Sequence, residues 1–214
     1  MGVSGSRRGA PRRAAESSGG RAAERARAAT RARLRASGQK LLAERGLHAV
    51  TSHEIANAAG VAAGTFYLHF RDKEELFREL VFDAVAELNA RLERSVLPLR
   101  DQPEAAARAR AETLLGFAEE HAELVRLAFG RGAEAATGVG AEALNQLVAR
   151  LERLIATQEK GTSRLHPAVT AQALVGMWAR VATWWAESPG RLPRAAVLET
   201  LVDLQLSGIR GGRT

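Results

Sequence analysis

The chain has 214 residues, of which 46% are hydrophobic, so it can bury a core and is not expected to be disordered throughout. It contains no cysteine, which excludes disulfides, thiolate metal sites and a cysteine nucleophile. The net charge is +7, and no apolar run reaches the roughly 18 residues of a membrane span. Because the N-terminus also lacks an apolar signal segment, we expect a soluble intracellular protein with no membrane partner.

The net positive charge comes from the N-terminal residues. Residues 1–35 carry ten arginines against two glutamates. Residues 1–27 contain almost no large apolar side chain, which predicts a flexible basic arm that cannot repay the entropy of ordering. A basic arm of this kind is typical of proteins that bind a polyanion. Nucleic acid is one candidate, and anionic lipid or a solvated tail without a partner are the alternatives.

Two short helices follow a longer one. Apolar side chains at helical spacing predict a first helix over residues 28–46. Thr51 and Glu54 form an S/T-x-x-E capping box, which predicts a second helix over 52–59. After three linking residues, a third helix is predicted over 63–70. Two short helices joined this tightly are typical of a helix-turn-helix.

The third helix has an apolar and an outward side. Phe66 and Phe70 lie four residues apart and are expected to point into the core. Gly60 suits the left-handed conformation that ends the second helix. The side chains left to face outward are Thr65, Tyr67, Leu68 and His69.

The rest of the chain is also predicted to be helical. Asp72 is expected to cap a long fourth helix that Pro98 ends. Helical spacing, with Pro or Gly at the ends, predicts further helices over 103–121, from there to 129, and over 141–160, 167–187 and 193–208. A Gly/Ala-rich loop is predicted over 130–140. The predicted fold is therefore all-α, with about nine helices and no useful strand.

The helix-turn-helix residues carry a longer pattern. In chain order it comprises Thr51, Glu54, Ile55, Ala56, Ala59, Gly60, Val61, Gly64, Thr65, Phe66, Tyr67, His69, Phe70, Lys73, Glu74 and Leu76. This pattern resembles the DNA-binding signature of TetR-type (TetR/AcrR-type) transcriptional regulators. The resemblance covers about residues 28–80. It implies a three-helix DNA-binding domain over 28–75 and a helical ligand-binding and dimerisation domain over 76–210.

The resemblance also implies roles for individual residues. Thr51 and Tyr67 would bind phosphates, His69 would do so or brace the third helix, and Lys73 would bind the backbone. The residues that would contact base edges lie on the third helix and next to it: Ala62, Ala63, Thr65 and Leu68. Ser52 would reach the bases from the second helix. Arg31 and Arg35 would enter the minor groove or bind phosphate.

The chain departs from the family pattern at three positions. Ala62 replaces a usual Ser or Thr and is a poor N-cap, at a cost of about 1 kcal/mol. Ala63 replaces a frequent Lys or Pro, and Leu68 replaces an often polar residue. Direct hydrogen-bond readout is therefore expected to be sparse, so contacts to thymine methyls, DNA shape and the N-terminal arginines would contribute more.

Candidate effector and dimer residues lie in the C-terminal part. An apolar or aromatic effector could contact Phe117, His121, Leu124, Phe129, Met177, Trp178, Val181, Trp184 and Trp185, although each also suits plain core. The last two helices carry broad apolar faces. Since TetR-type regulators pair through these helices, the candidate dimer residues are Leu174, Val181, Val197, Leu201 and Leu204.

No enzymatic, cofactor or metal site is expected. The histidines are scattered, and no HExxH or GxSxG motif occurs. We therefore expect a homodimeric repressor in the bacterial cytoplasm that binds a palindromic operator on double-stranded DNA and is released by a small effector. A DNA-binding regulator or activator without an effector is the alternative, and a helical enzyme or lipid-surface protein using the basic arm is a more distant one.

Overall fold

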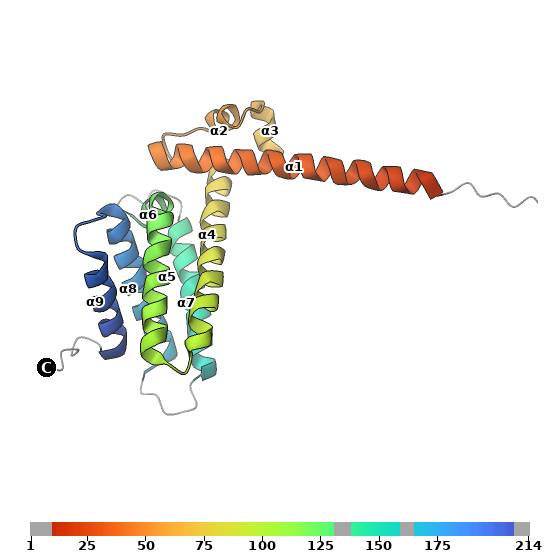
Figure 1. Ribbon diagram of the computed structural model, residues 1–214. Coiled ribbons are helices and arrows are strands. Elements are labelled where there is room, and N and C mark those ends of the chain that lie inside the picture. The colour runs from red at the N-terminus through yellow and green to blue at the C-terminus, as the bar shows by residue number, and fades with distance from the viewer. Residues whose placement is uncertain (1–9, 131–137, 159–164, 208–214) are drawn as a thin grey trace, which may run out of the picture.

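The computed structural model describes residues 10–130, 138–158 and 165–207, and the regular elements in these ranges are all helical (Figure 1). In none of these ranges is a helix long and apolar enough to cross a membrane. The elements in chain order are α1 (Ala10–Arg45), α2 (Ser52–Ala58), α3 (Ala63–Tyr67), α4 (Lys73–Val96), the 3-10 turn η1 (Leu97–Leu99), α5 (Pro103–Glu120), α6 (Ala122–Phe129), α7 (Val139–Gln158), α8 (Pro167–Glu187) and α9 (Arg194–Ser207).

The first helix is longer than predicted. It begins at Ala10 rather than near residue 28 and projects as a single rod beyond the rest of the chain (Figure 1). Alanine and arginine, both strong helix formers, dominate its first half, and the expected flexible arm is helical from residue 10. Residues 1–9 of that arm lie outside the described ranges. At the other end, Gly46 takes a φ of +79° and stops the helix, as expected.

The helix-turn-helix forms as the sequence predicts. Thr51 caps α2 with a complete capping box, and Gly60 turns the chain with a φ of +67°. The third helix is shorter than predicted: α3 ends at Tyr67, because the amides of Leu68 and His69 bond to carbonyls three residues back.

A shared core holds α3 and α4 on α1. Phe66 and Phe70 are buried, as predicted, and pack in one cluster with Leu34, Leu76 and Phe77. The same cluster continues into α6 and α7 through Ala128, Val139 and Ala143. The helix-turn-helix part and the C-terminal part therefore share buried apolar contacts at the upper end of α4.

The C-terminal helices form a bundle below α1 in which α4, α5, α7, α8 and α9 lie alongside one another (Figure 1). Their observed bounds agree closely with the predicted ones. One buried cluster lies between α5, α8 and α9, and a second joins α4, the α5–α6 junction and the end of α8.

A single substitution tests the missing cap of α3. Ala62 has extended N-cap geometry but offers no side-chain acceptor. Ala62→Ser supplies one, and we expect the free energy of unfolding in urea to rise by about 1 kcal/mol. Thr51→Ala, which removes an existing capping box, should lower it by about the same amount. An Ala62→Ser protein no more stable than the parent contradicts the assignment.

Candidate DNA-binding interface and effector domain

The outward side of α3 presents the side chains expected to face DNA. Tyr67 and Leu68 are 61% and 70% exposed, while Phe66 between them and the core is fully buried. The centres of the Phe66 and Tyr67 rings lie 5.5 Å apart in an edge-on arrangement, so the buried ring packs against the exposed one. Nothing lies within 4 Å of where a Gly64 side chain would start, so the helix start is slender. Of the other predicted base-reading residues, Ala62 is exposed and Ser52, Ala63 and Thr65 are partly exposed.

Thr51 is occupied by the capping box. Its hydroxyl accepts a hydrogen bond from the Glu54 amide at 3.2 Å and donates one to the Glu54 carboxylate at 2.8 Å. Arg45 lies 2.7 Å from the same carboxylate. The hydrogen bond from Arg45, followed by those from Thr51, lowers the pKa of Glu54 to about 2. Thr51 thus orders the start of α2, and a phosphate bound there would share its hydroxyl with Glu54.

Lys73 and His69 also have partners within the chain. Lys73, at the first position of α4, donates to the Val50 carbonyl at 2.7 Å and ties α4 to the segment before α2. Burial, and then the charges of Arg27 and Arg31, lower the pKa of His69 below its ordinary value. The imidazole is therefore neutral at pH 7, which favours bracing of α3 over ionic binding of phosphate.

Arg31 and Arg35 differ from the expectation of DNA contacts. Both side chains point at α4: Arg31 binds Glu79, and Arg35 binds Asp83 and lies 3.5 Å from Glu79. Their carboxylate partners lie 48 residues away in the sequence, so helical spacing within α1 gave no sign of them. In this structure the two arginines join α1 to α4.

Arg27 is a residue that the sequence reasoning missed. Its guanidinium donates to the Leu68 carbonyl at 3.4 Å, at the end of α3. It lies one helical turn before Arg31, and that i, i+4, i+8 spacing with Arg35 was the available signal.

The nine candidate effector residues fall into two groups. Met177, Trp178, Val181, Trp184 and Trp185 belong to the cluster between α5, α8 and α9, whereas Phe117, Leu124 and Phe129 belong to the cluster around α4 and α6. His121 joins the second group, since its ring lies 4.4 Å from that of Phe117 and 3.5 Å from the Glu87 carboxylate.

The tryptophans differ in their polar atoms. Trp185 donates its indole N–H to Glu119 at 2.9 Å. Trp178 is 7% exposed, and its indole nitrogen has no hydrogen-bond partner in the part of the chain that the structure describes. An orphaned buried donor is unusual, because it forfeits its bonds to water.

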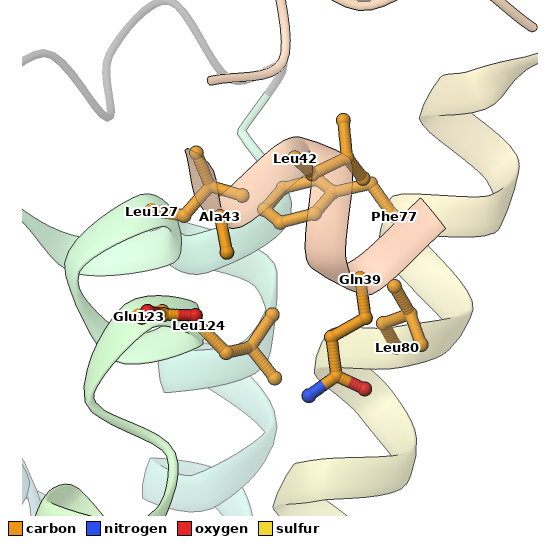
Figure 2. A pocket seen from close by; sticks show the side chains of 8 residues that line it. All are labelled: Gln39, Leu42, Ala43, Phe77, Leu80, Glu123, Leu124 and Leu127. Carbon is orange, nitrogen blue, oxygen red and sulfur yellow. The ribbon is translucent and has the colours of Figure 1, made fainter. Parts of the chain in front are cut away.

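Two hollows lie away from the tryptophans. Figure 2 shows a cavity of about 10 Å³ where α1, α4 and α6 meet, lined by Gln39, Leu42, Ala43, Phe77, Leu80, Glu123, Leu124 and Leu127. Of the candidate effector residues, it includes only Leu124. The second is an open groove of about 430 Å³ at the start of α8, lined by Leu165, His166, Val169, Thr170, Ala173 and Leu174.

The candidate dimer residues are mostly turned inward. Val197 and Leu201 are buried against α5 and α8, and Leu174 and Val181 pack partly on the same cluster. Only Leu204 of the five is exposed. Val197 and Leu201 therefore contribute to the core of their own chain, and their part in pairing stays a prediction. The exposed apolar side chains of this region are Leu165, Val169, Leu204 and Leu206.

Similar proteins agree on the DNA-binding segment. Residues 34–80 match the profile described as bacterial regulatory proteins, tetR family. The HTH-type transcriptional repressor KstR2 of Mycobacterium tuberculosis is 49% identical over 41 residues, which are 19% of this chain and 20% of that protein. KstR2 of Mycolicibacterium smegmatis is 42% identical over 43 residues, 20% of this chain and 21% of that protein. The matched segment thus spans about a fifth of these relatives.

Solved structures share the fold over most of the chain. The fatty acid degradation regulator FadR from Bacillus halodurans superposes with a TM-score of 0.69 at 22% identity, covering 85% of this chain and 97% of that one. FadR from Bacillus subtilis in complex with stearoyl-CoA gives 0.61 at 22% identity, covering 83% and 98%. The matching segment and this fold together make the chain similar to the bacterial regulatory proteins of the tetR family.

Proposed function

We propose that the chain is a transcriptional repressor of the bacterial cytoplasm that binds a palindromic operator as a homodimer and is released by a small apolar effector. The observation that carries the proposal is α3. Its Tyr67 and Leu68 project from a helix that Phe66 anchors in the core, within the segment that matches the family profile. A short helix held this way is a rigid probe for the major groove.

Positive charge beside α3 supports DNA as the partner. Arg21 and Arg25 are exposed along α1, which extends past α3 (Figure 1). Contacts from such side chains to phosphate add affinity without reading sequence. This would compensate for a recognition helix with few polar side chains.

Two copies per operator follow from the size of the probe. One helix of five residues offers few base contacts, and two-fold pairing doubles them on two half-sites. The exposed apolar side chains at the start of α8 and the end of α9 support pairing there: Leu165, Val169, Leu204 and Leu206.

Control by an effector would run through α4. This helix shares one buried cluster with α1 and α3 and another with the C-terminal bundle. An effector that binds more tightly to a bundle with α4 displaced would favour wrongly spaced recognition helices. The unpartnered Trp178 indole N–H marks the core between α5, α8 and α9 as the candidate place for it to bind.

The first prediction concerns the outward face of α3. DNase footprinting with the chain's own upstream DNA should give discrete protection over an inverted repeat. Tyr67→Phe removes one phosphate hydrogen bond and should weaken binding about five- to tenfold on every duplex, since a phosphate contact carries no sequence information. Uniform weak protection on all sequences contradicts the repressor.

The second prediction concerns charge on α1. The double substitution Arg21→Gln, Arg25→Gln should reduce the slope of log K against log salt by about 0.9 for each phosphate that the protein no longer neutralises. Arg100→Gln, a matched change at an exposed arginine beyond the far end of α4, should leave the slope unchanged. Equal slopes for all three proteins would rule out the arm as a phosphate-binding element.

The third prediction concerns the effector, with stearoyl-CoA as the probe because the structurally similar FadR from Bacillus subtilis was solved with it. Titration should quench the tryptophan fluorescence to saturation and release the operator, and Trp178→Phe should lose most of the quenching. Coenzyme A alone is the control. If neither this probe nor other apolar compounds quench fluorescence or release DNA, the alternative of a regulator without an effector is favoured.

A further inference from the structure

Three arginines on one face of α1 contact the end of the recognition helix and α4. Arg27, Arg31 and Arg35 are spaced by four residues, so they lie along one stripe of the helix. Arg27 donates to the Leu68 carbonyl at 3.4 Å, and Arg31 donates to the His69 carbonyl at 2.7 Å. These carbonyls follow the last residue of α3, where no further helical turn supplies amide N–H groups to donate to them.

Arg31 makes the larger set of contacts. Besides the His69 carbonyl, its guanidinium binds both oxygens of Glu79 on α4, and its carbon lies 4.3 Å from the centre of the Phe70 ring. All three of its side-chain nitrogens are therefore engaged inside the chain. An isolated exposed ion pair contributes little to stability. One planar guanidinium that spans three elements also fixes their geometry.

The turn of α4 that carries Glu79 also contacts α7. Glu79 is adjacent to Arg78, which binds Glu142 of α7 and lies 4.7 Å above the Phe82 ring. One turn of α4 is thus joined to α1 by Glu79, through Arg31 to the end of α3, and to the C-terminal bundle by Arg78.

We propose that Arg31 and Glu79 are positioning residues, which set the angle of α3 relative to α4 and so the spacing of the two recognition helices on the operator. This inference rests on the proposed function and replaces the expectation that Arg31 touches DNA. A small tilt of α3 moves both half-site contacts of a symmetric pair at once, so operator affinity depends on a contact that DNA never meets.

Glu79→Gln separates positioning from simple charge. If charge alone mattered, removing a carboxylate near a polyanion would tighten DNA binding. Positioning requires the opposite, because the neutral amide cannot hold the guanidinium as firmly. We expect about tenfold weaker binding to the operator and little change on random duplex. Tighter or unchanged operator binding overturns the proposal.

Substitutions of Arg31, the partner of Glu79, also test the positioning role. Arg31→Lys keeps the charge but loses the planar guanidinium, and it should weaken operator binding nearly as much as Arg31→Gln. Neither should reduce the salt slope, whereas removal of a phosphate-binding side chain would reduce it by about 0.9. Arg33→Gln is the matched control, since Arg33 is exposed on the same helix. A reduced slope for Arg31→Gln, or near-normal binding by Arg31→Lys, overturns positioning.

A measurement without DNA keeps this test independent of the proposed function. In hydrogen exchange on the full chain, Glu79→Gln should speed exchange in residues 62–70 several-fold without changing α5 or α8, and Arg33→Gln should not. Unchanged exchange in residues 62–70 counts against positioning. If the unmodified chain binds no duplex specifically, the proposed function fails instead.

Discussion

The burial of Phe66 and Phe70 in the core is the contact on which the proposed DNA-binding surface depends. A helix of five residues cannot persist alone, because the cost of starting a helix exceeds the gain from so few hydrogen bonds. Phe66 and Phe70 are buried in the cluster with Leu34, Leu76 and Phe77, so α1 and α4 fix the position of α3. The exposure of Tyr67 is a consequence, since one side of α3 is taken up by the core.

The fourth helix links this surface to the rest of the chain by two kinds of contact. Its apolar side belongs to both the α1–α3 core and the C-terminal core, which resist changes in packing. Its charged side chains reach α1 through Glu79 and Asp83, and α7 through Arg78 and Glu93. A rearrangement of the bundle that moves α4 therefore also moves the end of α3, and this is the physical route by which the proposed effector would act on the proposed DNA-binding surface.

The predictions of helix ends and turns were confirmed where they depend on residues close together in the sequence. The capping box at Thr51, the positive φ at Gly60 and the cap at Asp72 each depend on residues within a few positions, and each forms as expected. The start of α1 was placed too late, because the lack of apolar residues in 10–27 outweighed its high helix propensity in the sequence reasoning. The role of the arginines in α1 was missed because their partners lie far along the chain.

Local patterns along the chain were enough to predict the helix-turn-helix and the two faces of α3, since helix caps, turn glycines and the i, i+4 spacing of aromatics act over short distances. Which charged and apolar side chains find partners within the chain depended instead on tertiary packing. It turned Arg31 toward Glu79, buried Val197 and Leu201 within their own subunit, and divided the candidate effector residues between two clusters. The physical reason is that a partner for a surface side chain is chosen by helix packing, and packing brings together residues that no spacing rule connects.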